Sequence, residues 1–185
     1  MTMKVRCIVI LLVLVFSNSL LFSQSGDYHG SFSSHFLGWY PSARIEAMGR
    51  GFTSIDGDPN SYYFNPAGMS TMEGLNVTAG FANNYYVFDR AGYNFFSASF
   101  KINNIGVIGV SRDYSDLGPV EVMTGTGETV EYTPYHENYR MTFARELINN
   151  LYAGVNLNYF RVDYTIPVYN IKYERGAFLI DVGFF

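Results

Sequence analysis

The residues most capable of chemistry in this chain lie in a short stretch that reads DGDPN. Asp56, Asp58 and Asn60 have the alternate spacing with which a calcium-binding loop begins. Such a loop also needs a glycine at its sixth position and a glutamate at its twelfth, where this chain has Ser61 and Ala67. We therefore interpret the three side chains as turn-forming and helix-capping groups, and we expect no metal site here.

Three histidines and one glycosylation-type triplet complete the residues that could do chemistry. His29, His35 and His136 stand alone, with no second ligand at the spacing of a metal site. The triplet that begins at Asn76 falls inside a predicted strand, so we interpret it as a chance match. No nucleophile elbow, phosphate loop or paired-acid pattern occurs. The sequence therefore predicts no catalytic residues, no metal and no cofactor, and a protein that is not an enzyme.

The composition favours a chain whose faces meet different solvents. The 185 residues are enough for one domain. Charged residues make up 15% of the chain and aromatic residues 18%, whereas an ordinary soluble domain has about 25% charged residues. This balance suits a sheet with differently solvated faces, or a chain that faces lipid. The formal net charge of −4 gives no support for nucleic-acid binding.

Residues 1–23 have the three parts of a secretory signal peptide. Lys4 and Arg6 form a short basic region, the apolar run CIVILLVLVF follows, and a cut is predicted between Ser23 and Gln24. The alternative is an uncleaved membrane anchor, but the apolar run is shorter than the roughly 20 residues of a spanning helix. The signal therefore predicts an exported protein.

The exported part of the chain has neither thiols nor apolar runs of membrane-helix length. Cys7 is the only cysteine and leaves with the signal, so no disulfide or cysteine metal site is expected. After residue 23, no apolar run approaches the roughly 20 residues that a spanning helix needs. If this protein enters a membrane, it therefore does so with β-strands.

From Leu75 onward the chain divides into segments of about ten residues in which apolar and small or polar residues alternate. In one of them, Phe96 and Phe100 lie on one face while Ser97 and Ser99 lie on the other. The fold class predicted is all-β, an antiparallel transmembrane β-barrel of which this chain supplies about six strands. The predicted strands are 75–84, 92–101, 105–114, 137–147, 151–164 and 175–185.

The connections between these strands alternate between short and long. Two are the tripeptide INN, at 102–104 and 148–150, whereas the joins at 85–91, 115–136 and 165–174 are longer. Outer-membrane barrels have this asymmetry, with tight periplasmic turns and long external loops. A soluble secreted β-protein is the alternative, and it has no reason to keep the asymmetry. Inside the longest join, VEVM and ETVEY flank TGTG and predict a hairpin that projects outward.

Three charged side chains fall on the small and polar faces of the predicted strands, and these faces would line the interior of a barrel. They are Lys101, Arg140 and Asp181. Interior charges can tune a permeation path, but more often they hydrogen-bond a plug. We therefore expect these residues to be lumen-facing and to contact such a plug.

The residues that precede the strands have a different pattern. SARIEAMGR predicts a short helix over 42–50, with Ser42 as its N-cap and Gly49 or Gly51 at its end. In YYFNPAGMST, Pro66 predicts a second short helical turn. Three aromatic residues that precede it, Tyr62 among them, are expected to wedge against the barrel wall. The predicted domains are a signal peptide at 1–23, a hatch or plug at 24–74 and barrel strands at 75–185.

Residues 43–81 resemble the start of the FadL/PorV superfamily of outer-membrane β-barrels. Members of that family often have a small residue and Arg, then AMGGAF, then an acidic-Pro turn, then aromatic residues and NPAG. Arg50 departs from this pattern, because it replaces the glycine that usually follows Met-Gly, and we expect a less tight backbone there. The residues that match are Ala43, Arg44, Ala47, Met48, Gly49, Gly51, Phe52, Asp58, Pro59, Asn65, Pro66, Ala67 and Gly68.

The ending GAFLIDVGFF looks like the GxAFxxDxGxxY segment of PorV-type proteins, which favours the PorV/PorQ-like members from Bacteroidetes-type bacteria. The resemblance implies a barrel of about 14 strands in the bacterial outer membrane, with an N-terminal hatch folded inside. PorV-type members serve type IX secretion, so the expected partners are outer-membrane lipid, type IX secretion proteins and their substrates. FadL-type members instead transport long-chain fatty acids or other hydrophobic small molecules.

The chain departs from the family in the number of its strands. Six strands cannot close a membrane barrel, for which about eight is the usual minimum. We therefore favour a C-terminally truncated reading frame. The alternative is that the N-terminal region and the hairpin supply two further strands.

Overall fold

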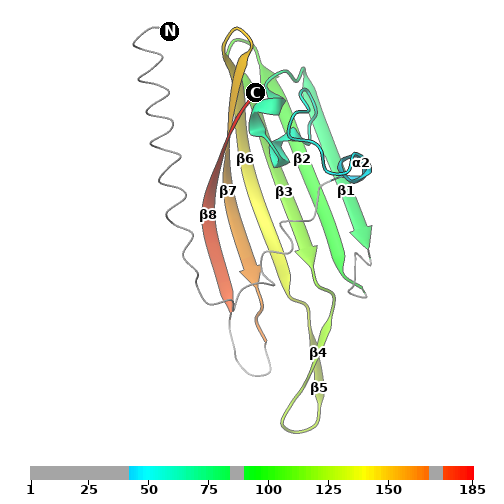
Figure 1. The fold of residues 1–185 in the computed structure, drawn as a ribbon. Coiled ribbons are helices and arrows are strands. Elements are labelled where there is room, and N and C mark those ends of the chain that lie inside the picture. The colour runs from blue at the N-terminus through cyan, green and yellow to red at the C-terminus, as the bar shows by residue number, and fades with distance from the viewer. Residues whose placement is uncertain (1–41, 84–89, 167–172) are drawn as a thin grey trace. The chain divides into compact units, whose positions relative to one another are not determined.

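The computed structural model describes residues 42–83, 90–166 and 173–185, and these residues form mainly antiparallel β-sheet (Figure 1). The predicted signal peptide at 1–23 and the predicted hatch up to residue 41 lie outside the described residues. No helix within the described part of the chain has the length and apolar character that crossing a membrane requires.

Six strands form one sheet in the order β1-β2-β3-β6-β7-β8, and each strand is antiparallel to its neighbours. The six predicted segments are confirmed, with ends that differ by at most two residues, and the all-β class is confirmed with them. Among the described residues, β1 and β8 are the two edges of this open sheet. The strands are β1 Leu75–Asn83, β2 Gly92–Ile102, β3 Gly106–Asp116, β6 Tyr135–Ile148, β7 Leu151–Asp163 and β8 Glu174–Phe184.

Asparagine makes both tight turns of the sheet possible. Asn104 follows β2 with a φ of 64°, and Asn150 follows β6 with a φ of 62°. Asparagine tolerates this left-handed conformation better than most residues, so the two INN tripeptides turn the chain within a few residues, as predicted. Both turns lie at one end of the sheet, and the strand ends that the longer connections join lie at the other (Figure 1). We call these the turn end and the loop end.

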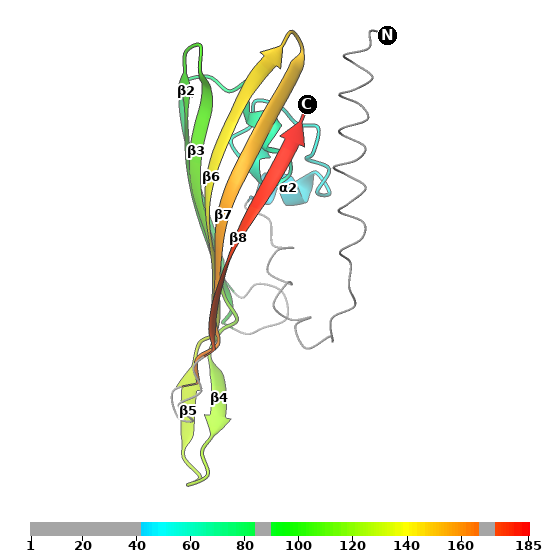
Figure 2. The same cartoon turned by 90° about the vertical axis from the view of Figure 1, so that its left-hand side faces the viewer.

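The longest connection contains the predicted hairpin, formed by β4 Val120–Met123 and β5 Thr129–Tyr132. It extends beyond the loop end of the sheet (Figures 1 and 2). The hairpin is a separate two-stranded sheet and adds no strand to the six. The described residues before β1 contain no strand either. The expectation that the hairpin could supply further wall strands is therefore wrong, because its strands pair only with each other.

Residues 42–74, which we call the hatch segment, fold into one α-helical turn and two 3₁₀ turns. These are α2 Ala43–Ala47, η2 Ser61–Tyr63 and η3 Pro66–Met69. The Ser42 Oγ accepts the N–H of Ile45 at 3.3 Å, so the predicted N-cap is confirmed. The predicted stop at Gly49 is confirmed, because the helix has Met48 as its C-cap and Gly49 and Arg50 then take φ values of 61° and 67°.

Hydrogen bonds hold the backbone at Arg50, at the end of the helix, and the expected looseness relative to the family pattern stays a prediction. The Arg50 N–H donates to the Ile45 carbonyl at 3.0 Å, and the Gly49 N–H donates to the Glu46 carbonyl at 3.0 Å. The residue adopts the left-handed conformation that glycine favours and closes the end of the helix in spite of its Cβ.

The hatch segment packs against one face of the sheet, which we call the covered face, and leaves the other, the open face, uncovered (Figure 2). On the open face Met141 is 64% exposed and Phe178 is 83% exposed, and many of their neighbours are similarly apolar. The covered face is instead buried and polar. Its buried polar residues include Ser97, Ser99, Ser111, Asp113, Asn138, Arg140, Thr142, Asn156 and Asn158. The sheet therefore buries its polar side and exposes its apolar side.

A small apolar core joins the hatch segment to the turn end of the covered face. Tyr62, Met69 and Met72 of the hatch segment pack there against Val107 of β3 and Ala144 of β6, all of them buried. Burying these side chains contributes roughly 1.5–3 kcal/mol for each large one, so it holds the hatch segment against the sheet without a disulfide.

Candidate functional site

The motif Asn65-Pro66-Ala67-Gly68 ties the hatch segment to the last strand of the sheet. The Asn65 Oδ1 accepts the N–H of Ala67 at 3.1 Å and so caps η3. The Asn65 Nδ2 donates to the carbonyl of Thr53 at 3.3 Å and to the carbonyl of Phe184 at 2.9 Å. One side chain therefore fixes the start of η3, an earlier part of the hatch segment, and β8.

Two glycines of the sheet let this motif approach the backbone of the strands. A Cβ at Gly154 of β7 would lie 2.4 Å from the Ala67 nitrogen, and a Cβ at Gly183 of β8 would lie 2.0 Å from the Asn65 Oδ1. Real Cβ atoms do not come this close to other atoms, so any larger residue would displace the hatch segment. The fit between motif and wall thus depends on both glycines.

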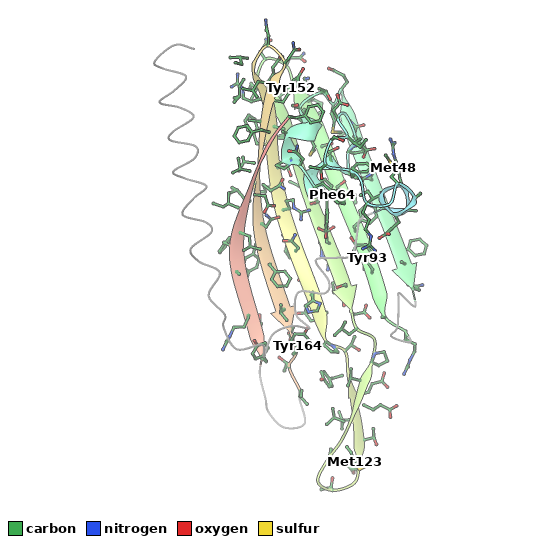
Figure 3. The ribbon with its side chains drawn as sticks, in the orientation of Figure 1. Met48, Phe64, Tyr93, Met123, Tyr152 and Tyr164 are labelled. Carbon is green, nitrogen blue, oxygen red and sulfur yellow. The ribbon has the colours of Figure 1, made fainter. Side chains whose placement is uncertain are left out.

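The matching residues that precede this motif, Arg44 and Asp58, make contacts within the hatch segment. A guanidinium nitrogen of Arg44 lies 3.1 Å from the Asp58 Oδ2, and the Asp58 Oδ1 accepts the N–H of Asn60 at 2.8 Å. Asp58 therefore forms a turn with Pro59, as the turn interpretation of DGDPN predicts. Met48, at the end of α2, is 42% exposed and is labelled beside this helix in Figure 3.

Gly68 packs closely against an earlier part of the hatch segment. A Cβ on this residue would lie 2.6 Å from the Ile55 carbonyl oxygen. The Gly68 carbonyl in turn accepts the N–H of Gly57 at 2.8 Å. The acidic-Pro turn and the NPAG motif, separate in sequence, are thus hydrogen-bonded neighbours.

Arg140 of β6 is the centre of a buried polar network on the covered face. Its Nε donates to the Asn158 Oδ1 at 2.6 Å, and a terminal nitrogen donates to the Asp113 Oδ2 at 3.3 Å. The two charged side chains are about nine-tenths buried, which would be costly for either one alone. The network therefore links β3, β6 and β7 below the hatch segment.

Asp181 of β8 extends the network to the edge of the sheet. Its Oδ2 accepts from the Asn158 Nδ2 at 2.9 Å and from the Asn156 Nδ2 at 3.2 Å. The Asn156 Nδ2 also donates to the Tyr62 carbonyl at 2.8 Å, while its Oδ1 accepts from the Thr142 hydroxyl at 2.7 Å. Asn156 thereby connects the hatch segment to β6 and β8 at once.

The aromatic residues of η2 lie over the Arg140 guanidinium. Its central carbon is 4.9 Å from the ring centre of Tyr62 and 5.3 Å from that of Tyr63. Cation–π attraction of this kind is stronger where water is excluded. Burial raises the pKa of the Tyr62 hydroxyl, so this residue stays neutral against the network. The expected wedge is observed as contacts of these two rings with Arg140 of the sheet. That the sheet is a barrel wall stays a prediction.

Lys101 contacts the hatch segment at the turn end. Its Nζ lies 3.3 Å from the Ser70 carbonyl and 3.4 Å from the Glu73 Oε1. All three charges singled out from the sequence, Lys101, Arg140 and Asp181, thus lie on the covered face. Lys101 and Arg140 contact the hatch segment directly, and Asp181 reaches it through Asn156. That these residues face a lumen stays a prediction.

Sequence reasoning missed four residues that this arrangement needs. Asp113 gives no clear signal because β3 is apolar on both faces at its start, so its alternation is weak. Asn156 has an uncharged amide, which by itself indicates no chemistry. For Gly154 and Gly183, only the backbone of the hatch segment shows why they lack a side chain.

The polar network of the covered face is occupied by contacts within the chain. The charges of the network are paired with each other or with amides, and η2 and η3 occupy the space above them. Within residues 42–83, 90–166 and 173–185, no cluster of three metal-ligating side chains occurs. Neither the scan against protein-family models nor the search of curated proteins finds a match for this chain, so the FadL/PorV resemblance stays a prediction.

Proposed function

We propose that this chain forms part of the wall of a bacterial outer-membrane β-barrel, with the hatch segment as the plug of its lumen. We further propose that it is a PorV/PorQ-like component of type IX protein secretion. One observation carries the first proposal: the sheet buries its polar face under the hatch segment and exposes its apolar face. Lipid outside and a plugged, polar lumen inside would satisfy both faces.

The limits of the apolar face support a membrane location. At the loop end of the open face, Arg112 pairs with Glu137, and Arg161 pairs with Glu174 at 2.8 Å. At the turn end, Arg145 of β6 faces the same side. Tyrosines accompany the charges at the loop end, as in the aromatic girdles of outer-membrane barrels. These are Tyr114, Tyr135, Tyr139 and Tyr159.

The height of the apolar band is also of the expected size. The strand between Glu137 and Arg145 is about 26 Å long, at ~3.3 Å per residue. A strand tilted by about 40° then covers about 20 Å of the membrane normal, close to the ~25 Å band of such barrels. A soluble secreted β-protein would instead expose these apolar side chains to water, and soluble proteins rarely expose contiguous apolar patches larger than a few hundred Å².

The covered face favours secretion over FadL-like transport. A transporter of fatty acids needs an apolar path through its lumen. The covered face offers serine, threonine and asparagine side chains and a charged network, and η2 and η3 pack on top of it. A fatty-acid tail there would leave buried polar groups without partners. We therefore propose that the hatch segment is a fixed part of the protein that secretion partners meet.

Single cysteines test the membrane location, because the described residues contain none. We would place a polarity-sensitive dye at Val77 or Met141 on the open face and at Ser97 or Thr142 on the covered face. In membranes, nitroxide-labelled lipids should quench the dye at the first two positions only. Equal quenching at all four positions, or recovery of the chain in the carbonate-soluble fraction, would contradict a barrel wall.

Deletion of the gene in its host separates secretion from transport. A secretion component should co-purify with other type IX proteins, and its loss should leave secreted cargo in the periplasm while fatty-acid uptake stays normal. Loss of fatty-acid uptake with normal export would establish the transport alternative instead. Complementation with the intact gene controls for effects on neighbouring genes.

A further inference from the structure

The open face has an apolar groove that side chains of the described residues line but do not fill. Its volume is about 410 Å³, and side chains from β2, β3, β6 and β7 line it. Ala98 makes it deep, since this small residue lies between larger neighbours on the same face. Those that define the groove are Phe100, Ile108, Phe143, Val155 and Leu157.

An arginine lies beside the turn end of this groove. Arg145 follows the groove residue Phe143 by two positions on the same face of β6. A Cβ at Gly106 of β3 would lie 3.0 Å from the Arg145 Cβ and 3.2 Å from the Phe143 ring. The missing side chain of Gly106 therefore lets the arginine stem and the phenylalanine ring lie side by side over the turn end of β3.

Arg145 differs from the arginines at the other end of the open face in its surroundings. Arg112 and Arg161 each pair with a glutamate on a neighbouring strand. The hydrogen bond that Arg145 makes, from its Nε at 3.3 Å, goes to the carbonyl of the adjacent Glu146. Its side chain is exposed, so its terminal nitrogens can reach an anion at the membrane surface.

We infer that the groove binds one acyl chain of a membrane phospholipid while Arg145 binds the phosphate of the same molecule. This inference rests on the membrane location proposed above. An apolar groove that ends at a cation matches the two parts of a phospholipid, and guanidinium groups bind phosphate with two parallel hydrogen bonds. The lipid comes from the leaflet at the turn end, where a headgroup is level with Arg145.

Phospholipid retention tests the inference. The full chain is purified from membranes in mild detergent, washed, and titrated with phosphatidylethanolamine, and bound lipid is counted by native mass spectrometry. Arg145→Gln should weaken retention about tenfold, the effect of losing a charge-assisted hydrogen bond. Ala98→Leu should fill the groove and abolish retention. Val155→Phe fills it from another strand if Ala98→Leu fails to fold.

Two control variants make the same kinds of substitution at positions outside the proposed lipid site. Arg161→Gln removes an open-face arginine at the loop end, and Ala79→Leu enlarges an open-face alanine of β1 outside the groove. Both should retain lipid like the wild type. Equal retention of phospholipid by all variants would overturn the inference. It would also be overturned if the protein bound free fatty acid but not phospholipid. Quenching of the dye at Val77 and Met141 is measured independently of lipid retention. Failure of the proposed membrane location can therefore be distinguished from failure of the lipid-binding inference.

Discussion

Arg50 has a backbone conformation that its own side chain disfavours. Its φ of 67° lies in the left-handed region, where a Cβ crowds the following carbonyl oxygen. Its guanidinium makes an ion pair with Glu46, with the Nε 3.2 Å from the Oε2, but both side chains are well exposed. Such exposed pairs contribute little to stability, so the ion pair does not offset the backbone cost.

We expect Arg50→Gly to stabilise the protein by about 0.5 kcal/mol, because relief of the left-handed strain exceeds both the lost ion pair and the added freedom of the unfolded chain. Urea unfolding of the full chain in micelles measures the change. Arg50→Ala is the control, since it removes the ion pair and keeps the Cβ, and it should be slightly destabilising. A loss of stability in the glycine variant would show that the arginine side chain outweighs its backbone.

Gly154→Ala should displace the hatch segment from the wall. The added methyl would lie 2.4 Å from backbone atoms of Pro66 and Ala67, which have no flexible end to move aside. Overpacking of this kind costs about 1–3 kcal/mol. Limited proteolysis within 42–74 should become faster, and amide exchange there should rise. Gly125→Ala is the control, because a Cβ at that position meets no atom within 4 Å.

At the scale of elements, the strands are held together by polar contacts as well as by their ladders. Arg140 on β6 reaches Asp113 on β3 and Asn158 on β7, and Asp181 on β8 accepts from Asn158. Four consecutive members of the sheet thus share one network. Breaking it in the middle leaves a buried carboxylate without its cation, which costs far more than an ordinary surface change.

Arg140→Met should therefore destabilise the protein by about 3–5 kcal/mol, because Asp113 keeps its burial and loses its charge partner. Adding Asp113→Asn should recover a large part of the loss, since the uncompensated charge is then gone. Arg161→Met on the open face is the matched control, because Arg161 and its partner Glu174 are both about one-third exposed and such a pair contributes little to stability. Comparable losses for the two arginines, measured by urea unfolding, would contradict the network.

At the scale of the whole molecule, the two ends of the sheet are different. Tight asparagine turns lie at one end, and the hairpin of β4 and β5 lies at the other. A barrel that begins in the periplasm keeps its short turns there and its long connections outside. The proposed membrane location therefore fixes which end faces the medium.

An epitope inserted after Gly125, at the tip of the hairpin, should be detected by antibodies on intact cells. The same epitope inserted between Asn103 and Asn104 should be detected only after the outer membrane is permeabilised. Both sites are surface turns, where insertions disturb folding least. Detection of both epitopes on intact cells, or of neither, would contradict the proposed orientation.

The strands were predictable from the sequence because period-two alternation and asparagine turns are local signals. The polar character of Ser97 and Ser99 was equally visible, but its burial was not, because only the docked hatch segment covers them. The roles of Gly154 and Asp113 also depend on residues far away in the sequence. Local patterns therefore identified the strands and the three charged residues of the covered face, Lys101, Arg140 and Asp181, while the fit between the sheet and the hatch segment required the three-dimensional structure.

The contact between Asn65 and Phe184 also determines the order in which parts of the protein can assemble. These residues are 119 positions apart, and the contact between Tyr62 and Asn156 spans 94. An exported chain leaves the cytoplasm from its N-terminus, so the hatch segment emerges first but its partner strands emerge last. Contacts of such long range form slowly. We therefore expect the hatch segment to stay undocked in the periplasm, accessible to proteases and chaperones, until β8 has also been exported.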